Sequence, residues 1–272
     1  MRKNRSATEV VLVTGCSSGI GKAICEHLGK SNVHVYGGSR SACTPQGWTH
    51  LKMDVTDEAS VQGVIDEIVL REGRIDAIVS CAGVSLVGSV EDTTVDEVKQ
   101  HFDTNFFGTV RMIRAVLPVM RKQASGKIIV IGSIGGLIGL PYQGYYSAGK
   151  FALDGLIEAM RTEIEPFGIQ ATVFHPGDFN TPIGANRVYC GNTNAQSAYH
   201  QTFVKTRDFY AASEAKAPAP TAVAHKVQKV LELRRLPARM LVGSPLEILG
   251  VWGKNLLPSR GFEYLFRKAY SP

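Results

Sequence analysis

Short apolar runs alternate with longer segments of helical periodicity through residues 9–176, and this alternation constrains the fold more than any other feature. The runs are four or five residues long and rich in β-branched side chains, which is typical of buried parallel strands. Strands are expected at residues 10–13, 33–36, 51–54, 75–79, 128–131 and 170–174. Helices are expected at residues 19–28, 58–71, 95–120 (ending near Pro118) and 146–167. This order predicts an α/β fold with a doubly wound parallel sheet and helices on both of its faces.

The alternation weakens after Pro176. Residues 181–216 are rich in Asn, Thr, Ala and Tyr, which predicts a mobile or partly helical insert rather than another strand unit. A helix is expected over residues 221–236 and a last strand over residues 240–242. We therefore predict one domain over residues 1–272, with a core at 9–181, a substrate lid at 182–220 and a C-terminal tail at 244–272.

Composition bounds the class of protein. A chain of 272 residues can bury a sizeable core as one domain. The net charge of +6 is spread along the sequence, which argues against a nucleic-acid partner but favours an anionic cofactor. The five cysteines are odd in number and lack metal-ligand spacing, so we expect reduced thiols, no metal site and a cytoplasmic location. No run reaches the ~20 apolar residues that cross a bilayer.

A glycine-rich turn joins the first strand to the first helix. It reads Thr14-Gly-Cys-Ser-Ser-Gly-Ile-Gly21, and its glycines would let the backbone approach a pyrophosphate at the helix N-terminus. The spacing differs from the G-x-G-x-x-G fingerprint, so the motif alone could also be only a tight turn. Its position directly after the first strand favours dinucleotide binding.

The end of the second strand indicates which dinucleotide binds. An acidic residue there binds the ribose 2′-hydroxyl of NAD, whereas an arginine accommodates the 2′-phosphate of NADP. This chain has Gly37-Gly38-Ser39-Arg40 and no acid. Arg40 can bind a phosphate through two hydrogen bonds and Ser39 can donate another. Arg40 could be an ordinary surface arginine, but within a dinucleotide fold it favours NADP(H) over NAD(H).

A serine, a tyrosine and a lysine flank the loop after the fifth strand. Ser133 would lie at the carboxyl edge of the sheet, where open α/β proteins bind ligands. Tyr146 and Lys150 are four residues apart and would share one helix face, with their Cβ atoms about 6 Å apart. A Tyr-x-x-x-Lys pair is common by chance. Thirteen residues after a strand-end serine, however, it predicts one catalytic crevice.

In this order the motifs resemble those of the short-chain dehydrogenase/reductase family over residues 9–181. The matching motifs are TGCSSGIG, Asp54-Val55, Ser80-Cys-Ala-Gly83, Asn105, Ser133, Tyr146-x-x-x-Lys150 and Pro176-Gly177 with Thr181. The resemblance implies a Rossmann-type fold and an NADP-linked interconversion of a carbonyl and an alcohol. Two departures are Ser80-Cys81 in place of the usual Asn-Asn, and Ser18 where some NADP-preferring members have a basic residue.

The resemblance also implies roles for individual residues. Tyr146 would be the general acid, and Lys150 would lower its pKa and bind the nicotinamide ribose. Ser133 would donate a hydrogen bond to the substrate oxygen, and Asn105 would hold a water of the proton relay. The implied cofactor contacts are Gly15, Ser17, Ser18, Gly19, Ile20, Gly21, Ser39, Arg40, Asp54, Val55, Cys81, Ala82, Gly83, Tyr146, Lys150, Pro176, Gly177 and Thr181.

Several of these residues have a plainer interpretation. Asn105 could satisfy backbone groups at a helix kink, and Asp54 could cap a turn. Tyr145 would lie on another helix face and form a pocket wall. His175 would serve packing or pocket polarity rather than bind a metal.

The substrate end of the predicted site is apolar. Its expected walls are Leu137, Ile138, Leu140, Tyr142, Phe179, Ile183, Val188 and Tyr189, with Ser133, Leu140, Tyr142 and Phe179 as substrate contacts. A lipophilic ketone or aldehyde is therefore expected, such as a steroid, a retinoid or a long-chain keto lipid. The tail most resembles the branch with 17β-hydroxysteroid and retinol dehydrogenases and 3-ketosphinganine reductases.

Other functions stay open at this point. The chain could be a 3-oxoacyl-type reductase of fatty-acid metabolism, or a non-catalytic redox sensor that binds a dinucleotide. The intact Asn–Ser–Tyr–Lys set favours an enzyme, because a sensor has no need of the tyrosine. The tail could cover the pocket, contact a membrane surface, or pair subunits, and the family implies a homodimer or homotetramer. Packing on its own domain is the plainer alternative.

Overall fold

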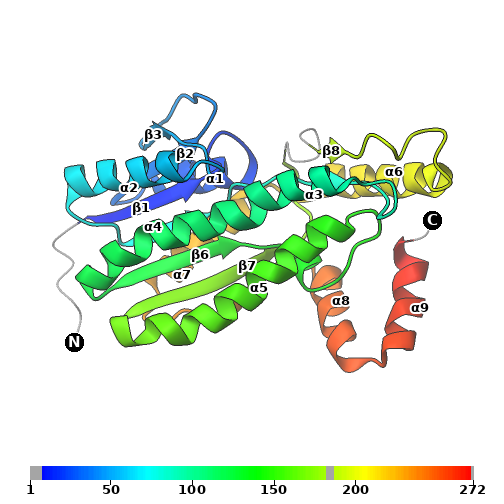
Figure 1. Cartoon of the computed structure of the whole chain (residues 1–272). Coiled ribbons are helices and arrows are strands. Elements are labelled where there is room, and N and C mark those ends of the chain that lie inside the picture. Colours follow the sequence, from blue (N-terminus) through cyan, green and yellow to red (C-terminus); the bar gives the residue numbers. More distant parts are fainter. Residues whose placement is uncertain (1–7, 182–186, 271–272) are drawn as a thin grey trace.

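A seven-stranded parallel sheet forms the centre of the computed structural model, which describes residues 8–181 and 187–270 (Figure 1). Its strands are β1 (Glu9–Thr14), β2 (Val33–Ser39), β3 (Thr49–Lys52), β4 (Ala77–Ser80), β6 (Gly126–Ile131), β7 (Ile169–Pro176) and β9 (Arg239–Val242). Their spatial order is β3-β2-β1-β4-β6-β7-β9. The order reverses between β1 and β4, and such switch points open a crevice at the carboxyl ends of the strands. The predicted doubly wound fold is confirmed.

Helices cover both faces of the sheet. One face packs against α2 (Glu58–Glu72), α4 (Gly108–Gln123) and α5 (Gly144–Ile164), and the other against α1 (Gly19–Leu28) and α7 (Thr221–Glu232). Alternate residues of β1 serve the two cores: Val10 and Leu12 face the first, and Val11 and Val13 the second. This period-two division explains why the strands are continuous apolar runs in the sequence.

The long helix predicted over residues 95–120 differs from the observed structure. It is divided into α3 (Val95–Phe102), a π-helical turn (Asp103–Phe107) and α4, and it continues past Pro118 to Gln123. Pro118 lacks the N–H that would bond one turn back. The buried side chains of Met112, Val116 and Met120 nevertheless hold α4 against the sheet.

The segments after β7 are more regular than predicted. The insert contains β8 (Val188–Tyr189), which pairs in parallel with β5 (Leu86–Val87), and a long helix α6 (His200–Lys216). The tail forms two helices, α8 (Pro245–Leu256) and α9 (Ser259–Tyr270), at the end of the sheet where the strands finish (Figure 1). None of the described helices combines the length and apolar character that crossing a membrane requires.

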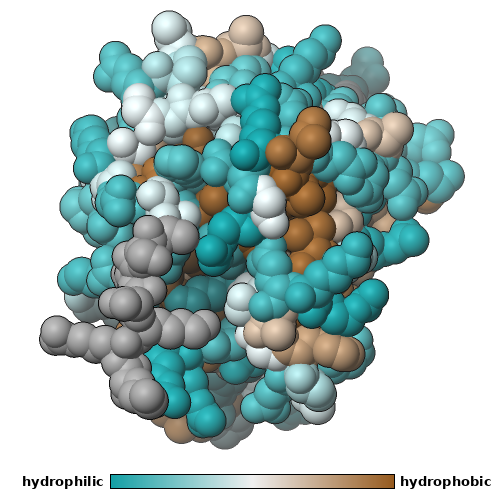
Figure 2. All heavy atoms as spheres, turned by 90° about the vertical axis from the view of Figure 1, so that its left-hand side faces the viewer, coloured by the Kyte–Doolittle hydropathy of each residue, from teal (hydrophilic) through white to brown (hydrophobic). Residues whose placement is uncertain are grey.

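The two ends of the sheet differ in surface character. The face on the left of Figure 1, where most strands begin, is covered mostly by hydrophilic residues (Figure 2). The chemistry-bearing motifs lie at the opposite end.

Candidate active site

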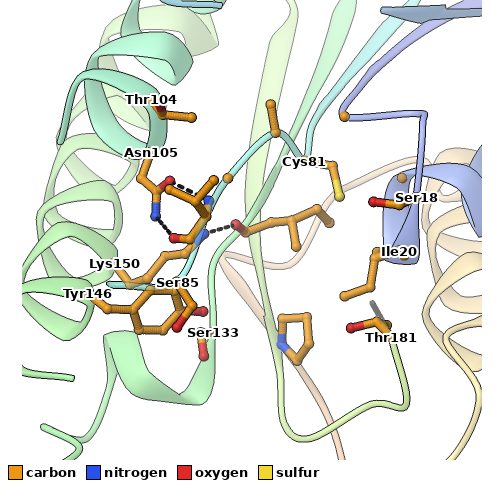
Figure 3. Close-up of a pocket in the computed structure, with 18 of the residues that line it drawn as sticks. Ser18, Ile20, Cys81, Ser85, Thr104, Asn105, Ser133, Tyr146, Lys150 and Thr181 are labelled. Atoms are coloured by element: carbon orange, nitrogen blue, oxygen red, sulfur yellow. Dashed lines mark hydrogen bonds between the residues drawn. The ribbon is translucent and has the colours of Figure 1, made fainter. Parts of the chain in front are cut away.

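A cleft of about 580 Å³ opens at the carboxyl edge of the sheet. All of the predicted catalytic and cofactor-contacting residues line it. Figure 3 shows Asn105, Tyr146, Lys150 and Ser133 on one side, with Ser18, Ile20 and Thr181 across from them. The catalytic set and the glycine turn therefore share one cavity.

The glycine turn is shaped by close backbone contacts. Gly15 has φ +72°, and a Cβ there would lie 2.9 Å from the Cα of Ala82. A Cβ on Gly21 would lie only 2.3 Å from the carbonyl oxygen of Gly15. Ser18 is the N-cap of α1 but forms no side-chain capping bond, so it does not occupy the first-turn N–H groups. These groups and the close backbone fit the pyrophosphate of a dinucleotide.

The turn is also tied to the neighbouring strand. The buried Oγ1 of Thr14 accepts hydrogen bonds from the backbone N–H groups of Cys81 and Ala82, both at 3.0 Å. This bond fixes the end of β1 against the end of β4. The family usually has Asn-Asn where this chain has Ser80-Cys81. This difference leaves the contact intact, because Thr14 bonds only to backbone N–H groups.

The adenosine end of the cleft carries Arg40 and Asp54. Arg40 is exposed, and within residues 8–181 and 187–270 its guanidinium forms no hydrogen bond or ion pair. Asp54 Oδ1 accepts hydrogen bonds from the N–H and the hydroxyl of Thr56, at 2.9 and 2.8 Å. The carboxylate therefore caps a turn, which was the plainer of the two interpretations of this residue. Ser39 is buried and already donates to the carbonyl of Ser41 at 2.8 Å. Arg40 is thus the group best placed to receive a phosphate.

Ser133 follows β6 and begins a short 3-10 turn. Its Oγ accepts a hydrogen bond from the N–H of Gly135 at 3.0 Å. Gly135 and Gly136 let this turn approach α5, since a Cβ at Gly136 would lie 2.9 Å from the Cβ of Lys150. The glycine pair therefore sets the separation between Ser133 and the helix that carries Tyr146.

Tyr146 and Lys150 share one face of α5, and the Lys150 Nζ lies 5.8 Å from the centre of the tyrosine ring. Burial raises the pKa of the Tyr146 hydroxyl, and its interaction with the Ser133 hydroxyl opposes this rise. Burial lowers the pKa of Lys150 to about 8. Desolvation is the largest of these effects, so the pKa of Tyr146 is raised in this structure rather than lowered as predicted. The Lys150 Nζ donates to the Ile131 carbonyl at 2.8 Å.

Asn105 lies in the π-helical turn between α3 and α4. Its Oδ1 accepts from the N–H of Val84 and its Nδ2 donates to the carbonyl of Val84, both at 2.8 Å (Figure 3). Its side chain thus satisfies backbone groups, as in the plainer interpretation. The role of Asn105 in holding a water stays a prediction.

His175, which the sequence assigns to packing or polarity, is fully buried behind Ser133. Its Nδ1 donates to the Ser133 carbonyl at 2.9 Å, and its Nε2 lies 3.1 Å from Asp154 Oδ1. Arg239 donates in turn to Asp154 Oδ2 at 2.8 Å. This chain of contacts joins β9, α5 and β7 to the backbone of Ser133 and holds it in place.

The substrate end differs from the predicted apolar pocket. Leu140 and Phe179 line the cleft, whereas Tyr142 does not: its hydroxyl bonds to Thr202 and its ring packs on Phe203, both in α6. The predicted wall residues Leu137 and Ile138 pack instead with the tail, and Val188 and Tyr189 are exposed. Ile183 lies outside the described residues.

Several lining residues were absent from the sequence-based site, among them Ser85, Thr104, Gln143, Asp178, Arg187, Tyr210 and Glu214. Asp178 directly follows Pro176-Gly177, so its proximity to that motif was a usable signal. Arg187 and Glu214 form an ion pair between the β8 segment and α6, and no local pattern reveals such a pair.

Comparisons with known proteins agree with this geometry. The short chain dehydrogenase family matches residues 9–189. A 3-ketodihydrosphingosine reductase of Bacteroides thetaiotaomicron is 37% identical over 264 residues, or 97% of this chain and 98% of that protein. The 17-beta-hydroxysteroid dehydrogenase type 1 of Homo sapiens is 38% identical over 192 residues, or 64% of this chain and 58% of that protein. The crystal structure of a short-chain dehydrogenase from Streptomyces avermitilis superposes with a TM-score of 0.81 at 29% identity, over 96% of this chain and 98% of that chain.

Proposed function

Because the chain belongs to the short-chain dehydrogenase/reductase family, we propose that it reduces a long-chain keto lipid with NADPH as hydride donor. The observation that carries this proposal is the convergence of Ser133, Tyr146 and Lys150 in one cleft with the glycine turn. An oxidoreductase of this family acts on carbonyl and alcohol groups, and the tyrosine supplies the proton that such a reduction needs. Burial raises the pKa of Tyr146, so its hydroxyl is protonated at neutral pH, as the acid of a reduction must be.

Each residue of the site has its own role in the proposed reduction. When bound, NADPH supplies the hydride for the carbonyl carbon. The Tyr146 hydroxyl protonates the carbonyl oxygen, and the Ser133 hydroxyl donates a hydrogen bond to the same oxygen. Lys150 binds the nicotinamide ribose, and its positive charge stabilises the tyrosinate left after proton transfer. The glycine turn and Arg40 hold the diphosphate and the 2′-phosphate.

The charged residues at the substrate end support an amino ketone as the substrate. Asp178 and Glu214 contribute two carboxylates to this end, and Arg187 contributes one guanidinium. Burial raises the pKa of both carboxyls. Arg187 already pairs with Glu214, so Asp178 is the carboxylate whose negative charge a bound cation would stabilise. Leu140 and Phe179 add apolar walls. A lipid that carries a protonated amine beside its ketone, as 3-ketodihydrosphingosine does, fits this combination better than a neutral steroid.

A substrate panel tests the function. The purified protein is given NADPH with 3-ketodihydrosphingosine, its N-acetylated form, a 17-ketosteroid, retinal and a 3-oxoacyl thioester, and NADPH oxidation is followed together with the product mass. The free amine should be reduced with the highest kcat/KM. N-acetylation removes the charge and should lower kcat/KM by about tenfold, equivalent to about 1.4 kcal/mol. No turnover with any member of the panel would favour the redox-sensor alternative.

The cofactor preference should depend on Arg40. Arg40→Ala should raise the dissociation constant of NADPH about 10- to 100-fold, because a charged hydrogen bond contributes about 1.5–3 kcal/mol. The dissociation constant of NADH should not change, since NADH has no 2′-phosphate. Both constants are measured by fluorescence titration. Arg114→Ala is the matched control, as Arg114 is exposed on α4 and pairs with Glu58. Equal affinity of the wild type for NADH and NADPH would contradict the preference.

The rate should fall at alkaline pH because Lys150 loses its proton. Burial lowers the pKa of this lysine to about 8, so the charged form that donates to the ribose predominates below that pH and declines above it. The pH profile of kcat/KM for NADPH should therefore be flat at neutral pH and fall through an apparent pKa of about 8. Lys150→Met should remove this limb, and Lys122→Met on the far end of α4 should keep it. A wild-type profile that stays flat well above this pKa is incompatible with the assignment.

The tail supports a peripheral contact with lipid. Val251, Phe262 and Phe266 of α8 and α9 pack on Ile134 and Ile138, directly after Ser133. The outer surface of α8 leaves four apolar side chains at least 58% exposed: Leu246, Leu249, Trp252 and Leu256. A lipid surface could cover this face beside the cleft, and a second subunit is the alternative.

Vesicle binding separates these two possibilities. The wild type should co-sediment with anionic phosphatidylglycerol vesicles, because the apolar face of α8 gains burial and the chain carries a net charge of +6. Leu249→Glu should abolish binding. Leu70→Glu is the matched control, since Leu70 is 88% exposed on α2. Loss of a dimer in size-exclusion chromatography on Leu249→Glu, without any vesicle binding by the wild type, would show subunit pairing instead.

A further inference from the structure

Two cysteines and a histidine meet beside the adenosine end of the cleft. Cys16 belongs to the glycine turn, Cys43 to the loop after β2, and His50 to β3. The two Sγ atoms are 3.9 Å apart, and the two sulfurs and one ring nitrogen all lie within 4.8 Å of one another. The spacing along the sequence gives no sign of this cluster, because the three residues come from separate segments.

The hydroxyl of Ser39 completes the group. Its Oγ lies 3.4 Å from Cys16 Sγ, 3.9 Å from Cys43 Sγ and 3.0 Å from His50 Nε2. Four atoms that can bind a metal thus lie close together: two sulfurs, one ring nitrogen and one hydroxyl oxygen. Ser39 also donates to the Ser41 carbonyl, so its two oxygen lone pairs remain available to accept a hydrogen bond or to bind a cation.

These separations can be compared with those of a tetrahedral zinc site. With Zn–S bonds of about 2.3 Å and tetrahedral angles, two thiolate ligands lie about 3.8 Å apart. The observed S···S separation is 3.9 Å, so the sulfurs need hardly move. With a Zn–N bond of about 2.0 Å, a sulfur and a nitrogen ligand lie about 3.5 Å apart. The two sulfurs and the ring nitrogen lie within 4.8 Å of one another, so a small rotation of the imidazole would bring the nitrogen to this separation.

The donor set is selective for thiophilic cations. Two thiolates and one imidazole suit Zn²⁺, whereas Mg²⁺ and Ca²⁺ require oxygen ligands. Two thiolates also balance the charge of a divalent cation, which reduces the cost of holding it in a partly buried place. Cys16 is buried, but Cys43 and His50 are partly exposed, so a cation can enter from the loop side.

We propose that Cys16, Cys43 and His50 form a binding site for a thiophilic divalent cation such as Zn²⁺, with the Ser39 hydroxyl or a water as the fourth ligand. The bound cation would join three segments that surround the adenosine end of the cleft: the glycine turn, the loop after β2, and β3. It lies outside the catalytic set of Ser133, Tyr146 and Lys150. The site is separate from the groups that react, but it adjoins the proposed cofactor site, because Cys16 lies in the glycine turn and Ser39 lines the cleft.

Cobalt titration tests the site in the full-length protein. Under anaerobic conditions with a non-thiol reductant, Co²⁺ should bind one per chain and give the visible bands of tetrahedral cobalt with a near-ultraviolet thiolate charge-transfer band. Zn²⁺ should displace it. Thermal unfolding with Zn²⁺ at about 100 times the dissociation constant should show stabilisation by a factor of about 100 in the folding equilibrium.

Single-ligand variants identify the residues. Cys43→Ser and His50→Ala should each weaken metal binding at least about tenfold, and Cys43→Ser should also lose charge-transfer intensity. Both positions are partly exposed, so circular dichroism should show an intact fold. Cys190→Ser is the matched control, because that buried thiol donates to the Asp92 carbonyl far along the chain and should not affect binding. The proposal fails if the wild type shows no charge-transfer band in excess Co²⁺, or if both ligand variants bind the metal as tightly as the wild type.

Discussion

Replacement of Tyr146 by phenylalanine should lower kcat for ketone reduction by about 10²- to 10⁴-fold, since the change removes the general acid and little else. The phenyl ring can keep the packing of the tyrosine ring, whose Cε1 lies next to Gly135 and whose centre is 6.0 Å from that of His101. The dissociation constant of NADPH should therefore stay close to the wild-type value. Single-turnover kinetics with saturating NADPH separate the chemical step from product release.

Tyr145→Phe is the matched control for this experiment. Tyr145 is the preceding residue in α5, but it does not line the cleft, and its hydroxyl donates to the Val90 carbonyl at 3.2 Å. Its loss should leave kcat near that of the wild type. Equal turnover by wild type and Tyr146→Phe would overturn the catalytic assignment, whereas a loss in both variants would point to a fold defect rather than lost acid catalysis.

The strands of the sheet could be predicted from the sequence because each of them has a recognisable local apolar pattern. A parallel strand buried on both faces must be apolar throughout, so β1, β4 and β6 stand out as runs such as VVLV and IIVI. Strand order, by contrast, is set by long-range pairing that leaves no mark in a single sequence. The two-residue strands β5 and β8 are too short for any periodicity, and they pair across about a hundred residues.

The difference between local and long-range contacts also explains which residues of the site could be predicted. Ser133, Tyr146 and Lys150 were predictable because a strand end and one helix turn place them together. A helix kink at Asn105 was one of the sequence interpretations, but the pairing of that side chain with the backbone of Val84 could not be predicted. Asp178 and its charged neighbours come from separate segments, and so do Cys16, Cys43 and His50. In these cases side chains far apart in sequence meet only after folding. The sequence predicted an apolar pocket from the residues near the strand ends, and no metal site from the spacing of the cysteines.

Substitution of Gly21 by alanine should disrupt the dinucleotide site, because the added Cβ would clash with neighbouring backbone atoms. The added Cβ would lie 2.3 Å from the Gly15 carbonyl oxygen and 3.0 Å from that of Thr14, so α1 must move away from the turn. We expect the free energy of unfolding to fall by about 1–3 kcal/mol, as for other overpacked positions. The displaced helix N-terminus should also weaken NADPH binding at least about tenfold. Chemical denaturation and fluorescence titration measure the two effects.

Gly63→Ala is the matched control: it is the same glycine-to-alanine change, but it should stabilise the protein instead of destabilising it. Gly63 lies within α2, and a Cβ there would meet no other described atom within 4 Å beyond its chain neighbours and the backbone of its own helix. Alanine should therefore stabilise the protein by about 0.5–1 kcal/mol, because it lowers the conformational entropy of the unfolded chain without a clash. NADPH affinity should be unchanged, since α2 does not hold the glycine turn. If Gly21→Ala behaved like Gly63→Ala in both measurements, the close approach of α1 to Gly15 could not be what shapes the phosphate cradle.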